Sequence, residues 1–464
     1  MVQISLTDTL SDFFAAEDDY HGVASYPKVL IGYNPISDVA LIPWLPPNNK
    51  YLIQQWRPVG PLDWSPITKL ILVPQRAAWV AGKMPVAFLK SGNQVIEKSV
   101  FDNLEKDIAD CSRILVDTCK FQPRFCSSMD ELSENVHGSL VIPYLPFDGI
   151  TNLPHYFDPD EHYDLQSKRA LALSGLPTPA ATLIDFEPHP AGWTGERLRN
   201  EIARAIEIIH KRSRPFVLKS NSSYGSKGVY LVHTQEDQAA MEVDICNCLT
   251  ADLPRLDSQN AQLHPFSLVL TDFLPGDAVC VNFWVRCDGT AQFSSCCGQD
   301  FSTTGHWLGG AITYSQQQQL ALTYSGIIGK TSQFLRSRGY HGPVGIDVMT
   351  DEAGMHQVVD LNPRLTGTWV LGCLRPHYSE HLLMDEACVL PFMNFKASRE
   401  CFNSAFQEDL EIGKLIVLAW CSDPTTSHCF TSLAAGGRNK VDRDSLIRRV
   451  NRWVEEMQPE DRQI

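Results

Sequence analysis

The 464-residue sequence lacks several features that would place it in a specialised class of protein. It has no run of 18 uncharged apolar residues and no basic N-terminal stretch followed by an apolar one. We therefore expect neither a transmembrane helix nor a secretory signal. The 14 cysteines are scattered, and no C-x-x-C step occurs. This pattern predicts free thiols in a reducing compartment, and so a cytoplasmic protein.

Basic residues are also few relative to acidic ones. The chain has 39 Lys and Arg against 54 Asp and Glu, a formal net charge of −15. Such a surface repels phosphate backbones, which argues against nucleic acid as a partner but allows a small anion in a local basic pocket. The length allows two to four domains, and a composition of 44% hydrophobic and 20% charged residues is typical of a globular protein.

The first 150 residues predict an open α/β unit. Short apolar runs at Val29–Ile31, Lys69–Val73 and Leu140–Ile142 indicate buried strands, and the apolar spacing within Val100–Lys120 indicates a helix between them. No phosphate-binding loop is recognisable here. The Pro- and Asp-rich stretch Pro143–Asp164 that follows predicts a linker or an exposed wrap.

The remainder of the chain alternates between predicted helices and strands. We predict helices at Ser167–Ser174, Glu196–Arg212 and Gln316–Arg338, and near the C-terminus around Leu446 to Met457. We predict strands at Ala181–Ile184, Phe216–Lys219, Gly228–Val232, Phe266–Phe273, Ala278–Arg286, Gly342–Thr350, His356–Asp360 and Lys414–Trp420. These elements suggest a division into residues 1–150, 151–235, 236–395 and 396–464.

The segment Lys219–Gly228 carries the first candidate chemistry. Lys219 ends a predicted strand, where its ammonium can neutralise phosphate, and the Ser- and Gly-rich loop behind it offers backbone N–H groups to a polyphosphate. The alternative is a plain hairpin turn with Lys219 solvated. The segment is not a P-loop, and the near match Gly329-Lys330-Thr331 has Tyr324 where that motif requires glycine.

Two predicted strands near residue 350 carry the second candidate. If they pair antiparallel, Asp347 meets Asp360 and Asn362, which are two residues apart and share one face. Three oxygen ligands suit Mg²⁺, which shares its other positions with water and substrate phosphates, whereas zinc would require His or Cys. The alternative is a strand-ending turn. Arg364 is either a surface arginine or a planar donor to a carboxylate or acyl phosphate.

The third candidate is the short break Leu274-Pro275-Gly276-Asp277 between two predicted strands. A break between sheets exposes a backbone N–H and C=O side by side, which can bind the edge of adenine. An acid just beyond can take ribose hydroxyls. The alternative is a plain hairpin.

The order of these segments resembles the ATP-grasp superfamily over about residues 150–395. The resemblance implies two α+β subdomains clasping a nucleotide, preceded by an open α/β pre-ATP-grasp domain, with ATP and Mg²⁺ or Mn²⁺ as cofactors. Lys168 and Lys219 match the nucleotide lysines, and Asp347, Asp360 and Asn362 the metal ligands. The remaining expected nucleotide-binding residues are Gly225, Ser226, Lys227 and Gly228 in the closing loop, and Asp272, Phe273, Leu274 and Asp277 at the hinge. The sequence departs from the family pattern at Asp360 and Asp277, where glutamate is usual.

The resemblance further implies a carboxylate–amine ligase that forms an amide through an acyl phosphate, releasing ADP and phosphate. Arg364, Lys219 and His306 are then the expected catalytic residues, although His306 could be an ordinary loop histidine. The N-terminal region and tail resemble natural-product peptide ligases, which points to an amino acid or small metabolite as substrate, no membrane partner and a possible homodimer. The alternatives are a kinase- or carboxylase-type ATP-grasp enzyme and a non-catalytic ATP-binding module. No biotin-attachment Met-Lys-Met tripeptide is present.

Overall fold

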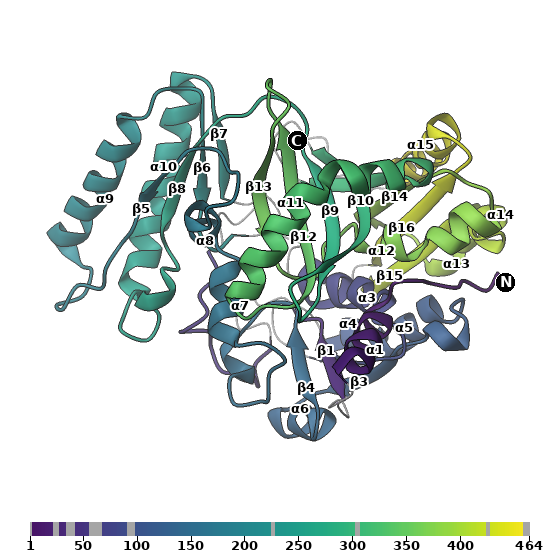
Figure 1. Ribbon diagram of the computed structural model, residues 1–464. Helices are drawn as coiled ribbons and strands as arrows, with labels where there is room; N and C mark the ends of the chain where they lie inside the picture. Colours follow the sequence, from purple (N-terminus) through teal and green to yellow (C-terminus); the bar gives the residue numbers. More distant parts are fainter. Residues whose placement is uncertain are drawn as a thin grey trace.

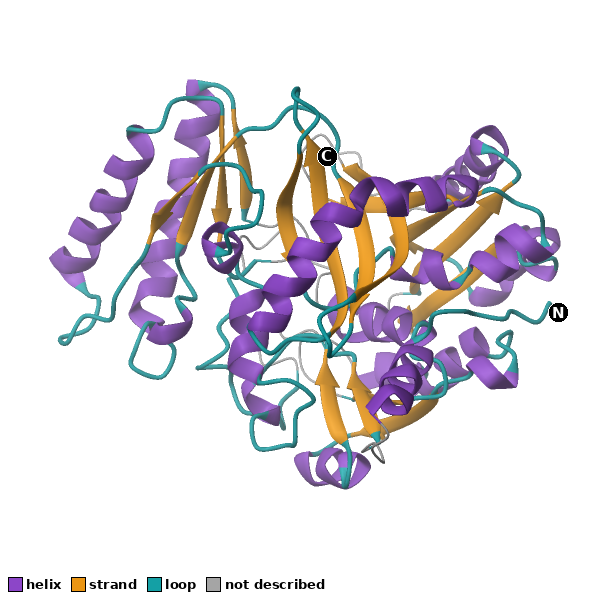
Figure 2. Ribbon diagram, viewed as in Figure 1, coloured by secondary structure: helices purple, strands orange, loops and turns teal. Residues whose placement is uncertain are grey.

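The computed structural model describes residues 2–21, 27–33, 42–54, 67–90, 98–223, 228–301, 307–423 and 427–457. Three β-sheets with helices on their faces make up this part of the chain (Figure 1, Figure 2). The small sheet and its two long helices stand to one side of a large central sheet, and the N-terminal sheet lies below it in Figure 1.

The N-terminal sheet has four parallel strands in the order β3-β2-β1-β4. This arrangement confirms the predicted open α/β unit. Its strands are β1 (Lys28–Ile31), β2 (Pro85–Leu89), β3 (Gln122–Cys126) and β4 (Leu140–Pro143), and the helices of this region are α1 (Leu10–His21), α3 (Val73–Trp79), α4 (Lys98–Asp102), α5 (Leu104–Ser112) and α6 (Met129–Val136).

Two predictions in this region are wrong. The run Lys69–Val73 is not a strand: a π-helical turn, Thr68–Leu72, leads directly into α3. Helix α3 and this turn contact the distant strand β15 (Leu415–Asp423), and the run is apolar because these elements cover it. A short apolar run by itself does not distinguish a strand from a buried helix. The predicted helix Val100–Lys120 ends at Ser112, because Leu115 instead forms a β-bridge with Ile4.

The stretch Pro143–Asp164 is neither a linker nor an exposed wrap. It contains helix α7 (Pro159–Leu165), which begins at Asp158, whose carboxylate accepts hydrogen bonds from two backbone N–H groups of the first turn. Phe147 and Ile150 are buried in the main core. The stretch therefore fixes the N-terminal unit against the rest of the chain.

The small sheet has four antiparallel strands in the order β5-β8-β6-β7. They are β5 (Ala181–Ile184), β6 (Phe216–Ser220), β7 (Val229–Val232) and β8 (Leu268–Asp272), and the associated helices are α8 (Lys168–Leu173), α9 (Gly195–His210) and α10 (Gln235–Asp252). Helices α9 and α10 cover one face (Figure 1), and their apolar sides form a separate core with Phe216 and Leu218.

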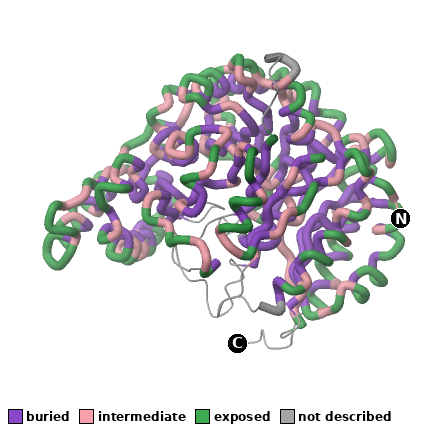
Figure 3. Tube along the Cα trace, turned by 90° about the horizontal axis from the view of Figure 1, so that it is seen from below, coloured by how far each residue is buried: buried purple, intermediate pink, exposed green. Residues whose placement is uncertain are grey.

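The central sheet has eight strands in the order β13-β12-β9-β10-β11-β14-β16-β15. Besides β15, its strands are β9 (Val279–Val285), β10 (Ala291–Phe301), β11 (Trp307–Thr313), β12 (Gly342–Thr350), β13 (His356–Asn362), β14 (Glu386–Phe395) and β16 (His428–Gly437). The helices of this region are α11 (Gln317–Ser337), α12 (Trp369–Cys373), α13 (Arg399–Ala405), α14 (Gln407–Glu411) and α15 (Lys440–Glu456). When the molecule is viewed from below, buried parts of the chain run through the middle of the molecule (Figure 3).

The sheets to which individual strands belong bear on the proposed division of the chain into residues 1–150, 151–235, 236–395 and 396–464, which stays a proposal. Strand β8 pairs with β6 in the small sheet although it follows residue 235, and strands β15 and β16 extend the central sheet although they follow residue 395. Thus the tail completes the sheet that carries the proposed metal ligands.

No disulfide bond joins any of the 14 cysteines, in agreement with the thiols that the sequence predicted. Among the described residues, none of the helices combines the length and apolar character needed to span a bilayer.

Candidate active site

The candidate site is built on the end of β13 and its neighbour β12. In their antiparallel register Asp347 lies opposite Asp360, and Gly345 opposite Asn362. Asp360 and Asn362 are two residues apart on one strand, and the Asn362 amide donates to the Asp360 carboxylate at 3.3 Å. The register therefore brings together the three oxygen-bearing side chains that the sequence singled out.

Lys168 reaches this group from the small-sheet side. Helix α8 begins at Ser167, whose hydroxyl accepts from the Ala170 N–H at 2.9 Å, and Lys168 is the first residue of that helix. Its ammonium forms an ion pair with Asp360 at 2.5 Å, and the two side chains are 8% and 26% exposed. A residue 192 positions earlier in the chain is thus the direct partner of Asp360.

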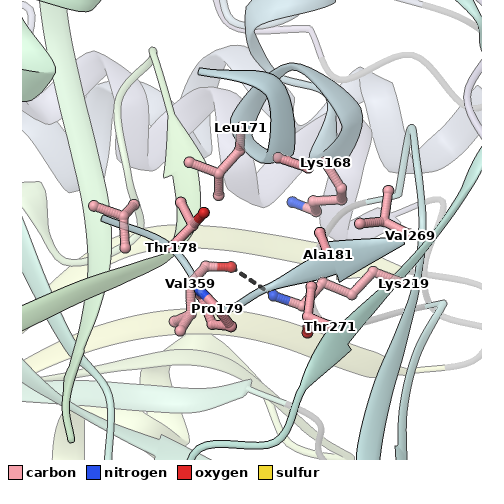
Figure 4. Close-up of a pocket in the computed structure, with 11 residues that line it drawn as sticks. Lys168, Leu171, Thr178, Pro179, Ala181, Lys219, Val269, Thr271 and Val359 are labelled. Carbon is pink, nitrogen blue, oxygen red and sulfur yellow. Dashed lines mark hydrogen bonds between the residues drawn. The ribbon is translucent and has the colours of Figure 1, made fainter. Parts of the chain in front are cut away.

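Lys219 reaches the same place from the end of β6. Its ammonium donates to the Val359 carbonyl at 2.6 Å, one residue before Asp360. Together with Lys168, Thr178 and Thr271, Lys219 lines a small pocket between the two sheets, and Figure 4 shows both ammonium groups directed into it.

Backbone contacts hold the two lysines in this relative position. The Lys168 N–H donates to the Asn221 carbonyl at 3.2 Å, and the Arg169 N–H donates to the Asn221 side chain at 2.8 Å. Asn221 is fully buried and lies directly beyond β6. The start of α8 is therefore tied to the end of the strand that carries Lys219.

The charges of this group are strongly coupled. Burial, opposed by the attraction of Asp360, lowers the pKa of Lys219 to about 8. Burial and the nearby charge of Asp360 raise the pKa of Asp347 to about 7. Burial also acts to raise the pKa of Asp360, but the adjacent ammonium groups of Lys168 and Lys219 outweigh it and hold that pKa below its ordinary value. Additional positive charge next to Asp347 would be stabilised.

The donor set fits a magnesium ion. The Asp347 and Asp360 carboxylates lie opposite each other, and the Asn362 side chain adjoins them through its amide nitrogen while its oxygen accepts from Arg364. Mg²⁺ commonly takes one or two carboxylates and completes its shell with water and phosphate. Within the described ranges, no three His, Cys, Asp or Glu side chains gather in a way that could hold a metal. Asp347, Asp360 and Asn362 are thus the residues suited to hold the ion.

Arg364 lies directly beyond the proposed metal ligands. Its guanidinium donates to the Asn362 side-chain oxygen and to the Tyr144 hydroxyl, both at 2.8 Å, and lies 5.1 Å from the centre of the Tyr144 ring. The loop that carries it is held by His162, whose Nε2 is 3.0 Å from the Pro363 carbonyl. Tyr144 belongs to the N-terminal unit, so all three sheets contribute to this region.

The predicted hinge residues lie in environments that differ from one residue to the next. Segment 273–278 connects β8 of the small sheet to β9 of the central sheet, and Gly276 adopts a φ of +108° that favours glycine. The Asp272 backbone N–H already donates to the Ala180 carbonyl, and its side chain pairs with Arg212. Asp277 is exposed. The predicted roles of Asp272, Phe273, Leu274 and Asp277 in binding adenosine stay predictions.

Four of the predicted site residues lie outside the described residues. They are Gly225, Ser226, Lys227 and His306. Gly228 is described, and its carbonyl accepts from the Ser220 N–H at 2.8 Å, which closes the loop after Lys219 at its base.

The sequence interpretation missed a buried polar network beneath the metal ligands. Asn282 is fully buried on β9, and its side chain bonds to Ser295, Thr366 and Thr368 at 2.6–3.1 Å. A lone asparagine in the otherwise apolar run Val279–Val285 is the signal that could have revealed it. This network supports the strand next to Asp347, because β9 pairs with β12.

Comparison with known proteins agrees with this geometry. Residues 188–368 match the model of the ATP-grasp domain. The structure is similar to an L-amino acid ligase from Bacillus licheniformis, with a TM-score of 0.51 and 12% identity over 93% of this chain and 98% of that chain. It is less similar to an N5-carboxyaminoimidazole synthetase from Staphylococcus aureus complexed with ADP (TM-score 0.49, 11% identity, 92% and 96% covered). A biotin carboxylase–β,γ-ATP complex from Campylobacter jejuni has a TM-score of 0.47 at 7% identity, with 93% and 91% covered.

A comparison with curated protein sequences finds no match. At these low identities, likeness to solved structures indicates the fold alone. Residues 188–368 thus match the ATP-grasp domain that the sequence resemblance predicted, and the chain has a mixed α/β fold. The reaction and the substrates are not determined by this likeness.

Proposed function

We propose that this protein is an ATP-dependent ligase that forms an amide bond from a carboxylate through an acyl phosphate. One observation carries the proposal: Lys168 and Lys219, 51 residues apart in sequence, both converge on the strand end at Asp360. Two cations, one from helix α8 and one from strand β6, that face two carboxylates of the central sheet form a site suited to a metal-bound polyphosphate.

The two lysines would bind the phosphates of ATP, since a desolvated ammonium is a strong partner for a phosphate oxygen. Asp347, Asp360 and Asn362 would hold Mg²⁺, which supplies charge neutralisation for the phosphates and orients the terminal one. In the absence of nucleotide, the ion pair between Lys168 and Asp360 keeps both charges compensated.

In the first step a substrate carboxylate oxygen attacks the γ-phosphorus, and the bond from that phosphorus to the bridging oxygen breaks, so ADP leaves. Arg364 is next to the proposed metal ligands and would position the carboxylate or the acyl phosphate through its planar donors. In the second step the amine attacks the acyl carbon, and phosphate leaves as the amine loses a proton. The net products are an amide, ADP and phosphate.

Trapping with hydroxylamine tests the reaction. The full chain is incubated with MgATP, hydroxylamine and a panel of amino acids and hydroxy acids, and hydroxamate and ADP are measured. Hydroxamate formed together with ADP supports the ligase. ADP without hydroxamate would instead indicate phosphoryl transfer of a kinase or carboxylase type, and nucleotide binding without turnover would indicate a non-catalytic module.

Substitutions test the site itself. Lys219→Met and Asp360→Asn should each lower turnover by a hundredfold or more, since loss of one charge contact to a transferring group costs on the order of 3 kcal/mol of barrier. Lys211→Met is the matched control, because that side chain is 71% exposed and pairs only with Glu207 on the same helix surface. Wild-type turnover in either site variant, with the control unchanged, would refute the assignment.

A further inference from the structure

A second recess lies where the N-terminal unit meets the loop after β13. Helix α3 lines one side of it through Val73, Arg76 and Ala77, and the loop lines the other through Leu365 and Gly367. Tyr144 also lines it, and its volume is about 20 Å³, which is room for one small group such as a carboxylate oxygen or a methyl. We call it the Arg76 recess.

The Arg76 recess adjoins the proposed site through two side chains. The Tyr144 hydroxyl, at the recess, accepts a hydrogen bond from Arg364, and Arg364 in turn donates to Asn362. The loop between them is fixed, because the ring of Trp307 lies so close to Gly367 that a Cβ there would approach it to 2.2 Å. Arg76 and Tyr144 therefore line the same recess, and Tyr144 links that recess to the proposed metal ligands through Arg364.

The positive charge of Arg76 is only weakly compensated by the groups around it in this recess. Among the described residues, Arg76 forms one hydrogen bond, a long one of 3.4 Å from Nη1 to the Pro391 carbonyl, and its buried Nε meets no acceptor there. Within the described part of the chain, no Asp or Glu forms an ion pair with it. Burial lowers its pKa, and the nearest group that opposes this effect is Tyr144.

The walls around this guanidinium are mostly apolar, so the protein offers little else to satisfy its charge. A buried donor without an acceptor is costly, and a guanidinium forms a strong charge-assisted hydrogen bond to a carboxylate oxygen. The carboxylate that reacts must lie at the γ-phosphate next to the metal ligands. A carboxylate bound to Arg76 is thus a different one.

We propose that the Arg76 recess binds a second, non-reacting carboxylate of the substrates, so that either the amine is an amino acid or the activated molecule is a small dicarboxylate. This inference rests on the proposed ligase function, which it extends by naming the substrate class. Arg76 is then a specificity-determining residue on the N-terminal unit.

Binding of paired probes tests the proposal on the full chain loaded with Mg²⁺ and a non-hydrolysable ATP analogue. The pairs are L-alanine with L-alaninamide, and succinate with its monoamide succinamate. In the wild-type protein the more acidic probe of at least one pair should bind tenfold tighter or more. Preference within the alanine pair assigns the carboxylate to the amine substrate, and preference within the succinate pair assigns it to the activated substrate.

Variants assign the preference to Arg76. Arg76→Met should reduce the acid-to-amide ratio to less than threefold without changing affinity for the ATP analogue, whereas Arg76→Lys, which keeps the charge, should retain part of it. Arg113→Met, at an exposed arginine of the same unit, is the control and should retain all of it. Melting temperatures show whether each variant folds. If Arg76→Met does not fold, the comparison of the paired probes in the wild-type protein still tests the proposal.

Two results would overturn the inference: no acid preference in the wild type, or an equal preference in wild type and Arg76→Met. The two proposals fail separately. Hydroxamate formation without an Arg76-dependent acid preference would defeat only the recess. An Arg76-dependent preference without hydroxamate would defeat the ligase and leave a carboxylate-binding recess whose carboxylate has no assigned reaction.

Discussion

At the scale of single residues, environment sets the chemistry more than residue type does. Asp347 and Asp360 are the same residue on paired strands, yet the pKa of one is raised and the pKa of the other is lowered. The difference arises because Lys168 pairs directly with Asp360 while Asp347 is chiefly desolvated. Residue identity alone could not have predicted which carboxylate holds its negative charge more firmly.

His162 gives a prediction at this scale. It is 1% exposed, and burial lowers its pKa to about 3 from an ordinary 6.5. Below pH 6.5 the unfolded chain therefore binds a proton that the folded chain does not bind until about pH 3. Stability should fall as pH drops through this window, by about 2 kcal/mol from this group at pH 5.

Urea unfolding of the wild type and of His162→Gln at several pH values measures this effect. The variant should be less stable near pH 7.5, and its disadvantage should shrink as the pH is lowered towards 4. His137→Gln, at an exposed histidine, should keep the wild-type pH dependence. A constant difference between wild type and His162→Gln across the window would contradict the prediction.

At the scale of elements, local sequence signals were reliable where they reflected local physics. Strands β5 and β12 match the predicted bounds, and α11 was predicted to within a residue at each end, because apolar periodicity and turn residues define them. The prediction of a strand at Lys69–Val73 failed because the apolar character of this run comes from contact with β15, some 340 residues away. Strands β2, β3, β10, β11, β14 and β16 were not predicted at all.

Helix α10 offers a prediction at this scale. Thr234 precedes it, and its hydroxyl accepts from the Asp237 N–H while the Asp237 carboxylate accepts from the Thr234 N–H, a reciprocal capping box. Thr234→Ala should destabilise the protein by about 1 kcal/mol, measured as a shift in the urea midpoint. Thr250→Ala, at an exposed position in the same helix, should change stability by no more than about 0.5 kcal/mol. Equal effects of the two substitutions would argue against capping.

At the scale of the whole molecule, the N-terminal unit and the central sheet share one hydrophobic core. Phe13 of α1 stacks on Trp284 of β9, with ring centres 4.8 Å apart, and Phe14 meets the same ring edge-on. The small sheet has its own core and joins the rest through the hinge and α8.

This shared core predicts that the N-terminal unit does not unfold independently. Phe13→Ala should cost about 3–5 kcal/mol, the usual range for removal of a buried phenylalanine side chain. It should lower the main unfolding midpoint followed by tryptophan fluorescence. Leu322→Ala, at a side chain that is 66% exposed on α11, is the control and should have little effect. A separate early transition with the main midpoint unchanged would contradict a common core.

The sequence by itself determined the parts whose physics is local or ordered along the chain. Free cysteines, the open α/β unit and the ATP-grasp resemblance followed from composition, periodicity and an ordered set of motifs. Only the tertiary structure decided that Lys168 pairs with Asp360, that Tyr144 contacts Arg364, and that Arg76 faces a recess beside them. These contacts join residues 192, 220 and nearly 300 positions apart, and no periodicity or spacing in a single sequence records which distant surfaces fold together.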